Sequence, residues 1–195
     1  MSELADSLRR IASDLDEANV AFALIGGLAV SVRAEPRFTR DADLAVSVRT
    51  DADSEALVRH LLGRGYALES SVEQAATGRL ATVRLTRSDS DDSPVVDLLF
   101  ASSGIEPDLV ARAEPLEILP DLTIPVALTG DLMALKVLAR DDLERPQDVA
   151  DLRALLRVAS DSDLTQAQAS LALIERRGYH RGRALVQAFL ELRRP

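Results

Sequence analysis

Cysteine is absent from the 195-residue chain, and this absence excludes several kinds of site. Without a thiol there is no disulfide, no thiolate metal site and no cysteine nucleophile. Aromatic residues are also scarce, at 3% of the sequence. The core must therefore be built from Leu, Ala, Val and Ile, and the chain has few of the stacking surfaces that many nucleic-acid binders present.

Long apolar runs are missing as well. No stretch approaches 18 uninterrupted apolar residues, so the sequence predicts no membrane span. The N-terminal segment 1–16 is charged and helix-like, and it lacks the apolar run and small-residue cleavage site of a signal peptide. We therefore predict a cytoplasmic protein with no membrane partner.

Lysine is almost absent from an acidic chain. The formal net charge of -9 opposes non-specific binding to polyanions. Of the 23 basic residues, Lys136 is the one lysine and all others are arginine. An ammonium and a guanidinium are not interchangeable, so a lysine kept against this bias suggests a specific role. Residues 176–195 are locally rich in arginine, which we interpret as a solvated face or as a surface for a tRNA or a partner.

Hydrophobic periodicity divides the chain into an α/β part and a helical part. The first part is expected to hold helices at 3–18, 28–34 and 52–63, strands at 21–25, 43–48, 66–70, 80–86 and 95–100, and a solvated turn at 88–93. The second is expected to hold helices at 129–142, 146–159, 163–177 and 181–193, with Thr129 and Ser162 as caps. The irregular spacing of the strands favours a mixed sheet. We therefore predict an α/β (α+β) fold with a core at 1–125 and a C-terminal helical subdomain at 126–195.

Three carboxylates stand out in this pattern. Asp41 and Asp43 are two residues apart, so on a strand their side chains face the same side. Asp97 interrupts an apolar strand, where a carboxylate is costly unless it is paired or bound to metal. Close carboxylates need a cation or a proton between them, and Mg²⁺ suits oxygen ligands that it shares with phosphates. If the two strands are neighbours, the three side chains form a metal site.

A glycine pair follows the first predicted strand. Gly26-Gly27 lets backbone N–H groups approach a triphosphate, and the positive end of the following helix adds to this. The chain has neither the G-x-G-x-x-G nor the P-loop pattern. Taken singly, each feature has an ordinary explanation: a strand-ending turn for the glycines, a surface acidic pair for Asp41 and Asp43, and an amphipathic border for Lys136.

The ordered set carries a resemblance to a known family. Gly26-Gly27, the run Arg37-x-Thr39-x-Asp41-x-Asp43 and the later Asp97 resemble the DNA polymerase β-like nucleotidyltransferase superfamily. More narrowly, the chain resembles the AbiEii/MenT group, the toxins of type IV toxin–antitoxin pairs. That group also has a helical Lys followed by Arg-x-x-Asp-x-x-Asp, here Lys136 and then Arg145, Asp148 and Asp151. The resemblance spans roughly residues 20–155.

The resemblance implies a reaction and a set of roles. An NMP would pass from an NTP to an acceptor hydroxyl, with Mg²⁺ as cofactor and pyrophosphate as product. Asp41, Asp43 and Asp97 would bind the metal, with Asp97 also a candidate base, and Lys136 would neutralise triphosphate charge. The remaining nucleotide-binding set would be Gly26, Gly27, Arg37, Thr39, Arg40, Asp148 and Asp151, with either acid orienting the lysine or touching the base or ribose.

The acceptor and the partners stay open at this point. The resemblance implies the 3′ end of a tRNA as acceptor and a cognate antitoxin as protein partner. A chain this acidic, with so few aromatics, instead favours a protein or a small molecule such as an antibiotic. A third hypothesis is a nucleotide-binding module that has lost catalysis, against which the intact acidic triad speaks.

Overall fold

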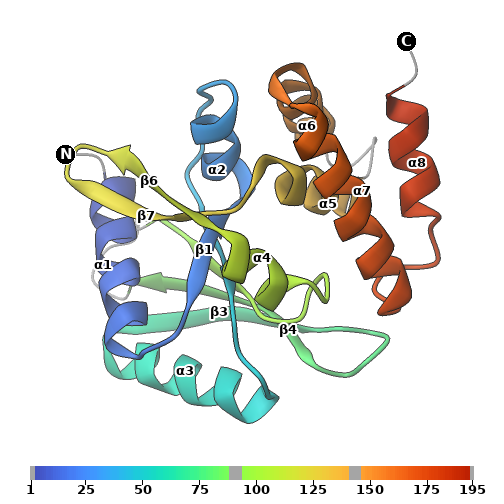
Figure 1. Cartoon of the computed structure of the whole chain (residues 1–195). Coiled ribbons are helices and arrows are strands. Elements are labelled where there is room, and N and C mark those ends of the chain that lie inside the picture. Colours follow the sequence, from blue (N-terminus) through green and yellow to red (C-terminus); the bar gives the residue numbers. More distant parts are fainter. Residues whose placement is uncertain (1–2, 88–93, 141–145, 194–195) are drawn as a thin grey trace.

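The computed structural model describes residues 3–87, 94–140 and 146–193 (Figure 1). The expected turn at 88–93 and Arg145 lie outside the described residues. Within them, seven strands form one sheet in the order β3-β4-β5-β2-β1-β7-β6. The strands are β1 (Phe22–Ile25), β2 (Ala42–Val46), β3 (Tyr66–Glu73), β4 (Leu80–Arg87), β5 (Val96–Leu99), β6 (Glu114–Leu119) and β7 (Leu122–Val126).

The helices surround this sheet. In Figure 1, α1 and α3 lie at the left and the bottom of the molecule, whereas α5 to α8 gather at the right. Their bounds are α1 (Glu3–Glu17), α2 (Gly26–Arg33), α3 (Asp51–Gly63), α4 (Glu106–Arg112), α5 (Thr129–Ala139), α6 (Pro146–Val158), α7 (Asp161–Arg176) and α8 (Leu185–Leu192). Strand β2 runs antiparallel to β1 but parallel to β5, and β1 runs parallel to β7. The mixed sheet and the α/β fold class are therefore confirmed.

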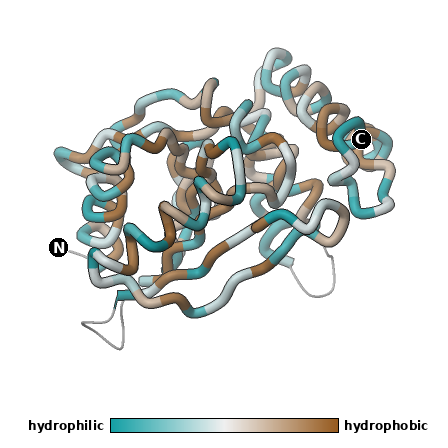
Figure 2. Tube along the Cα trace, turned by 90° about the horizontal axis from the view of Figure 1, so that it is seen from below, coloured by the Kyte–Doolittle hydropathy of each residue, from teal (hydrophilic) through white to brown (hydrophobic). Residues whose placement is uncertain are grey.

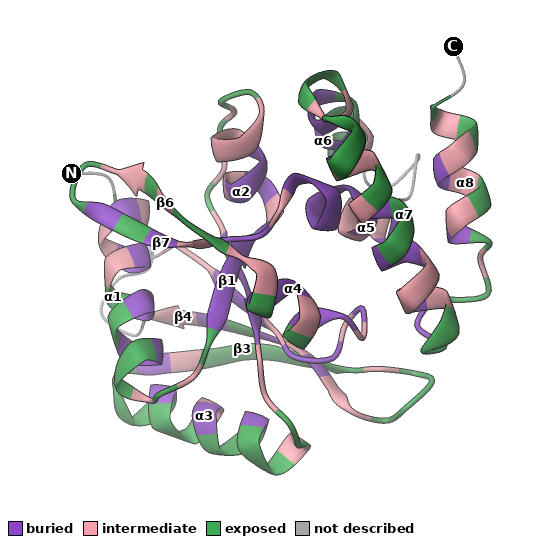
Figure 3. Ribbon diagram, in the orientation of Figure 1, coloured by how far each residue is buried: buried purple, intermediate pink, exposed green. Residues whose placement is uncertain are grey.

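One face of the central strands is wholly apolar. Leu44, Leu98 and Val83 lie opposite one another across β2, β5 and β4, and all three are buried. Removing a side chain of this size from water contributes roughly 1.5–3 kcal/mol. Figure 3 shows the buried residues concentrated on the central strands, with exposed residues on the outer surfaces of the helices. This packed sheet is the rigid support for the residues on its other face.

Helix α1 adds an amphipathic layer to this core. Leu8, Ile11 and Leu15 recur at helical spacing and are buried, as the sequence pattern predicts. Figure 2 shows the same alternation of hydrophobic and hydrophilic positions along the helices. No helix among the described residues is long and apolar enough to cross a membrane.

Three elements between residues 105 and 126 were not predicted from the sequence: helix α4 and the antiparallel hairpin of β6 and β7. Pro115 and Pro125 are unusual in strands, because proline has no N–H to donate to a neighbouring strand. The prolines are tolerated because β6 is the last strand of the sheet and Pro115 lies opposite Pro125. Asp121 adopts a left-handed φ of 63° in the turn that joins the two strands.

Two predicted helix caps are wrong. The residue before α5 is Leu128, which makes no side-chain cap, so Thr129 does not cap that helix. Helix α7 starts at Asp161 and is capped by Ser160 rather than Ser162, because Ser160 and Asp163 satisfy each other's backbone N–H groups. The last helix begins at Leu185 instead of residue 181, since Arg181 and Gly182 both have positive φ.

Candidate active site

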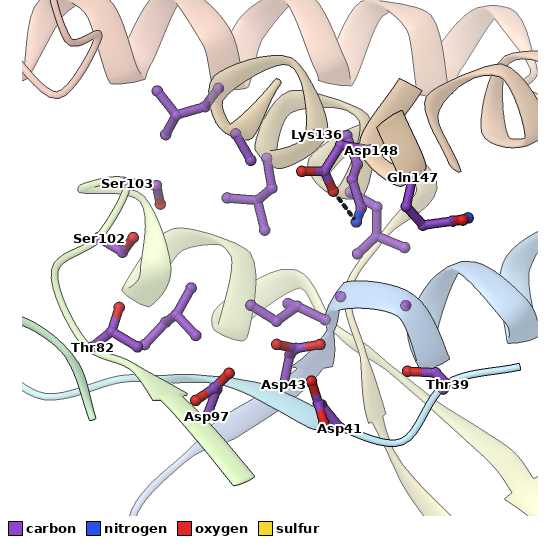
Figure 4. Close-up of a pocket in the computed structure, with 18 of the residues that line it drawn as sticks. Thr39, Asp41, Asp43, Thr82, Asp97, Ser102, Ser103, Lys136, Gln147 and Asp148 are labelled. Atoms are coloured by element: carbon purple, nitrogen blue, oxygen red, sulfur yellow. Dashed lines mark hydrogen bonds and ion pairs between the residues drawn. The ribbon is translucent and has the colours of Figure 1, made fainter. Parts of the chain in front are cut away.

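Four neighbouring strands place a row of side chains on the face of the sheet opposite the apolar one. Ile25 of β1 pairs with Asp43 of β2, Asp43 with Asp97 of β5, and Asp97 with Arg84 of β4. Side chains at paired positions project from the same face. Asp43 and Asp97 are therefore direct neighbours, and Figure 4 shows Asp41, two residues earlier, turned towards the same space.

Asp43 is the most perturbed acid in this group. Burial raises the pKa of Asp43 to about 6, and the nearby carboxylates of Asp97 and Asp41 raise it as well. Lys136 and the backbone N–H of Gly27 act in the opposite direction but do not cancel the rise. A carboxyl group in this position is stabilised by any cation that approaches it.

Asp97 already has a cationic partner. Arg84 donates from Nε to Oδ1 of Asp97 at 2.9 Å and from Nη2 to Oδ2 at 2.7 Å. These hydrogen bonds raise the pKa of Arg84 further above its usual value. Among the residues that the structure describes, no three acidic or histidine side chains are drawn together as metal ligands. The contact with Arg84 is bidentate and uses both oxygens of Asp97.

Both glycines lie close to side chains of the site. Gly26 has a φ of 64°, and a Cβ there would lie 1.9 Å from Oδ2 of Asp43. A Cβ on Gly27 would lie 2.1 Å from Nη2 of Arg37. Helix α2 begins at Gly26, two residues earlier than the sequence pattern predicts. The turn therefore places the first residue of α2 directly beside the side chain of Asp43.

The opposite wall of the site comes from α5 and α6. Nζ of Lys136 lies 2.7 Å from Oδ1 of Asp148 and 2.8 Å from Oδ2 of Asp151. Nη2 of Arg37 donates to Asp151 at 3.0 Å, as does Nε2 of Gln147 to the other oxygen of that carboxylate. Burial acts to raise the pKa of Asp151, but hydrogen bonds from Lys136, Gln147 and Arg37 outweigh it and hold the pKa below its usual value.

A pocket of about 590 Å³ separates the two walls. This volume lies within the range of small-molecule sites. Figure 4 shows the three aspartates on one side of the space and Lys136 with Asp148 on the other. Nine candidate residues line it: Gly26, Gly27, Arg37, Thr39, Asp41, Asp43, Asp97, Lys136 and Asp148. The other two do not: Asp151 is buried behind Lys136, and Arg40 packs on the ring of Phe38.

Several residues of the pocket lining were not predicted from the sequence, and Arg84 is the most important of them. The lining also includes Thr82, Ser102, Ser103, Gln147 and Arg181. The alternation along β4 could have indicated two of them. Ala81, Val83 and Leu85 are buried, and Thr82 and Arg84 alternate with them on the other face of the sheet.

Part of the arginine-rich C-terminal segment has a structural role. Arg183 donates to the carbonyl oxygens of Val137 and Leu138 and so satisfies the end of α5. Arg177 bonds to the carbonyl oxygen of Gly104 and to the carboxylate of Asp108. These two side chains tie α5 and α4 to the C-terminal segment, so neither is a simple solvated charge.

Solved nucleotidyltransferases share this fold. A nucleotidyltransferase-like protein from Paracoccidioides brasiliensis is 19% identical, with 97% of this chain and 92% of that chain covered and a TM-score of 0.53. ANT(2'')-Ia in complex with adenylyl-2''-tobramycin is 12% identical, with 90% and 99% covered and a TM-score of 0.59. The lincosamide antibiotic adenylyltransferase LnuA, bound to lincomycin, is 15% identical, with 79% and 97% covered and a TM-score of 0.51. At these identities the similarity shows the fold alone.

The family assignment comes from a sequence comparison. No curated protein matches the chain. The family model of the nucleotidyl transferase AbiEii toxin of type IV toxin–antitoxin systems matches residues 8–194, which include both walls of the pocket. The resemblance seen in the sequence is thereby confirmed, and the chain belongs to the AbiEii family of nucleotidyltransferase toxins.

Proposed function

We propose that this enzyme transfers an NMP from an NTP to an acceptor hydroxyl, with Mg²⁺ held by Asp41, Asp43 and Asp97. The observation that carries the proposal is the pairing of Asp43 with Asp97 on adjacent strands, across a pocket from Lys136. Such an arrangement sets a negative wall for a cation opposite a positive group for the phosphates.

The residues present fit a hard divalent cation. All three are carboxylates, and the raised pKa of Asp43 reflects burial beside two like charges that a cation would compensate. When a metal is bound, Asp97 would supply an oxygen that Arg84 contacts in this structure. Mg²⁺, when bound, supplies charge neutralisation at the phosphates and polarises the reacting phosphoryl oxygen.

The two parts of the chain divide the work. We assign the carboxylates and the glycine turn to a catalytic core at 1–125, and Lys136, Asp148 and Asp151 to a helical subdomain at 126–195. Gly26, Gly27, Arg37 and Thr39 contact the triphosphate from the start of α2 and the loop after it. Asp148 and Asp151 hold the Lys136 ammonium in place with two of its three N–H donors, and the third serves a phosphate.

The transfer step needs one base. The acceptor oxygen bonds to the α-phosphorus, the bond from that phosphorus to the bridging oxygen breaks, and pyrophosphate leaves with the electron pair. The hydroxyl proton passes to a carboxylate oxygen of Asp97, which lines the same pocket. Arg84 and Lys136 offset the charge that develops on the transferred group.

We further propose that the acceptor is the 3′ end of a tRNA, that the reaction takes place in the cytoplasm where NTPs are available, and that a cognate antitoxin controls it. Membership of a type IV toxin–antitoxin family supports this reading. The second candidate is a small-molecule or protein acceptor, which the fold shared with two antibiotic adenylyltransferases favours.

A screen with labelled nucleotides tests the proposal. Each α-labelled NTP is incubated with the enzyme and Mg²⁺, against total tRNA in one series and extract protein in another, and pyrophosphate release is followed in parallel. We expect label in RNA, none with EDTA and none with Asp43→Asn. Label in protein alone would overturn the tRNA acceptor, and NTP binding without pyrophosphate release would overturn the transferase reading for this chain.

A further inference from the structure

One aromatic side chain stands apart from all the others. The chain has four Phe, two Tyr and no Trp. Five of these six rings are buried in the core: Phe22, Tyr66, Phe100, Tyr179 and Phe189. The sixth, Phe38, is 78% exposed. It is therefore the exposed ring among these six, and it lies on a loop next to the candidate active site.

Phe38 lies on the loop between α2 and β2, which also carries Arg37, Thr39 and Asp41 of the pocket lining. Arg37 and Thr39 are partly buried, whereas Phe38 and Arg40, which alternate with them in the sequence, are exposed and outside the lining. The pocket residue Asp41 follows three positions after Phe38, at most about 10 Å of extended chain. The ring is therefore a near neighbour of the reaction site without being part of its lining.

The backbone under Phe38 is held in place. The amide of Arg37 donates to Oγ of Ser31 at 3.3 Å, and that hydroxyl is also 3.3 Å from the carbonyl oxygen of Arg37. The Arg37 side chain binds Asp151 on α6, and its Nη1 donates to the carbonyl oxygen of Phe38 at 3.1 Å. These contacts hold the backbone at Phe38 in place, so the exposed ring needs little ordering when it binds a ligand.

The exposed ring has a guanidinium beside it. The Cζ atom of Arg40 lies 5.5 Å from the centre of the Phe38 ring. Aromatic rings and guanidinium planes are the two surfaces on which proteins stack unpaired bases, and an arginine also attracts the neighbouring phosphate. The core of a protein–protein interface would instead present more apolar surface around the ring. The other exposed large hydrophobic side chains among the described residues are not on this loop: Leu62, Leu68 and Val72 lie on α3 and β3, and Val158 lies at the end of α6.

We propose that Phe38 and Arg40 form a stacking platform for an unpaired nucleobase of the acceptor, just before the hydroxyl that enters the pocket. The ligand class is the single-stranded end of a nucleic acid. This inference rests on the proposed transfer to an acceptor hydroxyl and specifies which acceptors reach it. Since the chain carries a net charge of -9, binding depends on this local surface instead of on overall charge.

The absence of tryptophan allows a direct test. Phe38→Trp, made together with Asp43→Asn to prevent turnover, introduces a single indole as reporter. It is titrated with a short RNA that has an unpaired 3′ end and, separately, with a blunt duplex of the same sequence. We expect quenching by the single-stranded end and little by the duplex. Leu62→Trp is the matched control, because Leu62 is 40% exposed and lies on α3, which contributes no residue to the pocket lining.

Affinity gives the second readout. Phe38→Ala should weaken binding of the single-stranded RNA by roughly 5- to 150-fold, the range for loss of one base–aromatic stack, and Phe38→Tyr should retain most of the affinity. Equal fluorescence responses at positions 38 and 62, or unchanged affinity in Phe38→Ala, would overturn the platform. That result leaves the transferase reading intact if the nucleotide screen still shows pyrophosphate release. Transfer to protein alone would also overturn the platform.

Discussion

The two walls of the pocket balance their charges differently. On the strand wall, Asp41, Asp43 and Asp97 face one cation, Arg84, whose side chain is 47% exposed. On the helical wall, Lys136 is 12% exposed and is held by two buried carboxylates at 2.7 and 2.8 Å. The first wall has more negative charge than its own cation can balance, whereas the second is already satisfied within the protein.

This difference indicates where binding changes the protein and where it does not. A wall with excess negative charge is stabilised by an added cation, so it is the wall that responds to metal. A wall whose lysine is fixed by two carboxylates offers a preset position to an incoming phosphate and loses little freedom on binding. Substitutions on the strand wall should therefore change chemistry and metal binding, and those on the helical wall should change stability and nucleotide affinity.

The largest effect is expected for Asp43→Asn. Loss of this carboxylate should lower the transfer rate by at least about 10²–10³-fold, as removal of one charge-stabilising group does in other enzymes. The melting temperature without metal should not fall, because one of three close like charges is removed. Rate assays and thermal melts measure the two effects, with exposed Asp16→Asn on α1 as control. A fully active Asp43→Asn enzyme would contradict the assignment of the strand wall.

Lys136→Ala should act mainly on stability and nucleotide use. It leaves Asp148 and Asp151 buried without the lysine, and removing one partner of a buried ion pair costs about 3–5 kcal/mol. Denaturant melts measure this loss, and the KM for NTP should rise among the molecules that remain folded. Lys136→Arg should restore neither fully, because a planar guanidinium does not replace a compact ammonium between two carboxylates. Full rescue by arginine would show that charge alone matters there.

A third prediction concerns the effect of pH on the stability that Asp43 contributes on the strand wall. Its pKa is raised from 3.8 to about 6, so the folded state binds a proton there that the unfolded state has lost. The stability that this group contributes is present below pH 4 and is lost as pH rises through 6. In EDTA, wild type should therefore lose about 3 kcal/mol relative to Asp43→Asn across this window. Denaturant melts at each pH measure the difference, which Mg²⁺ should reduce; parallel curves would contradict the prediction.

How far the sequence predicts each wall depends on the kind of contact involved. Asp41, Asp43 and Asp97 could be found because strand alternation and the cost of an acid among apolar residues are local signals. Lys136 was found from composition. The pairing of Arg84 with Asp97 could not be found, because it depends on β4 lying next to β5 in a particular register. Sequence periodicity gives the face on which a side chain lies, but the sheet order decides its partner.

Arg84→Ala tests the contact that the sequence did not reveal, and its effect on stability should be small. The side chain is half exposed, so the ion pair contributes about 1 kcal/mol or less. The effect on metal binding should be larger, because Arg84 competes with a cation for both oxygens of Asp97. Without nucleotide, Mn²⁺ used as a spectroscopic substitute for Mg²⁺ should bind of order tenfold more tightly to Arg84→Ala, a difference of about 1.4 kcal/mol.

The matched control for this measurement is Arg59→Ala, which removes an exposed arginine paired with Glu55 on α3, outside the pocket lining. Its Mn²⁺ affinity should equal that of wild type. Tighter Mn²⁺ binding in both variants would indicate a general effect of net charge, an effect that salt screens. If Arg84→Ala binds Mn²⁺ no more tightly than wild type does, Arg84 does not limit the access of the metal to Asp97. The strand wall would then lack an internal competitor for the metal, and Arg84 would act on the transferred phosphate instead.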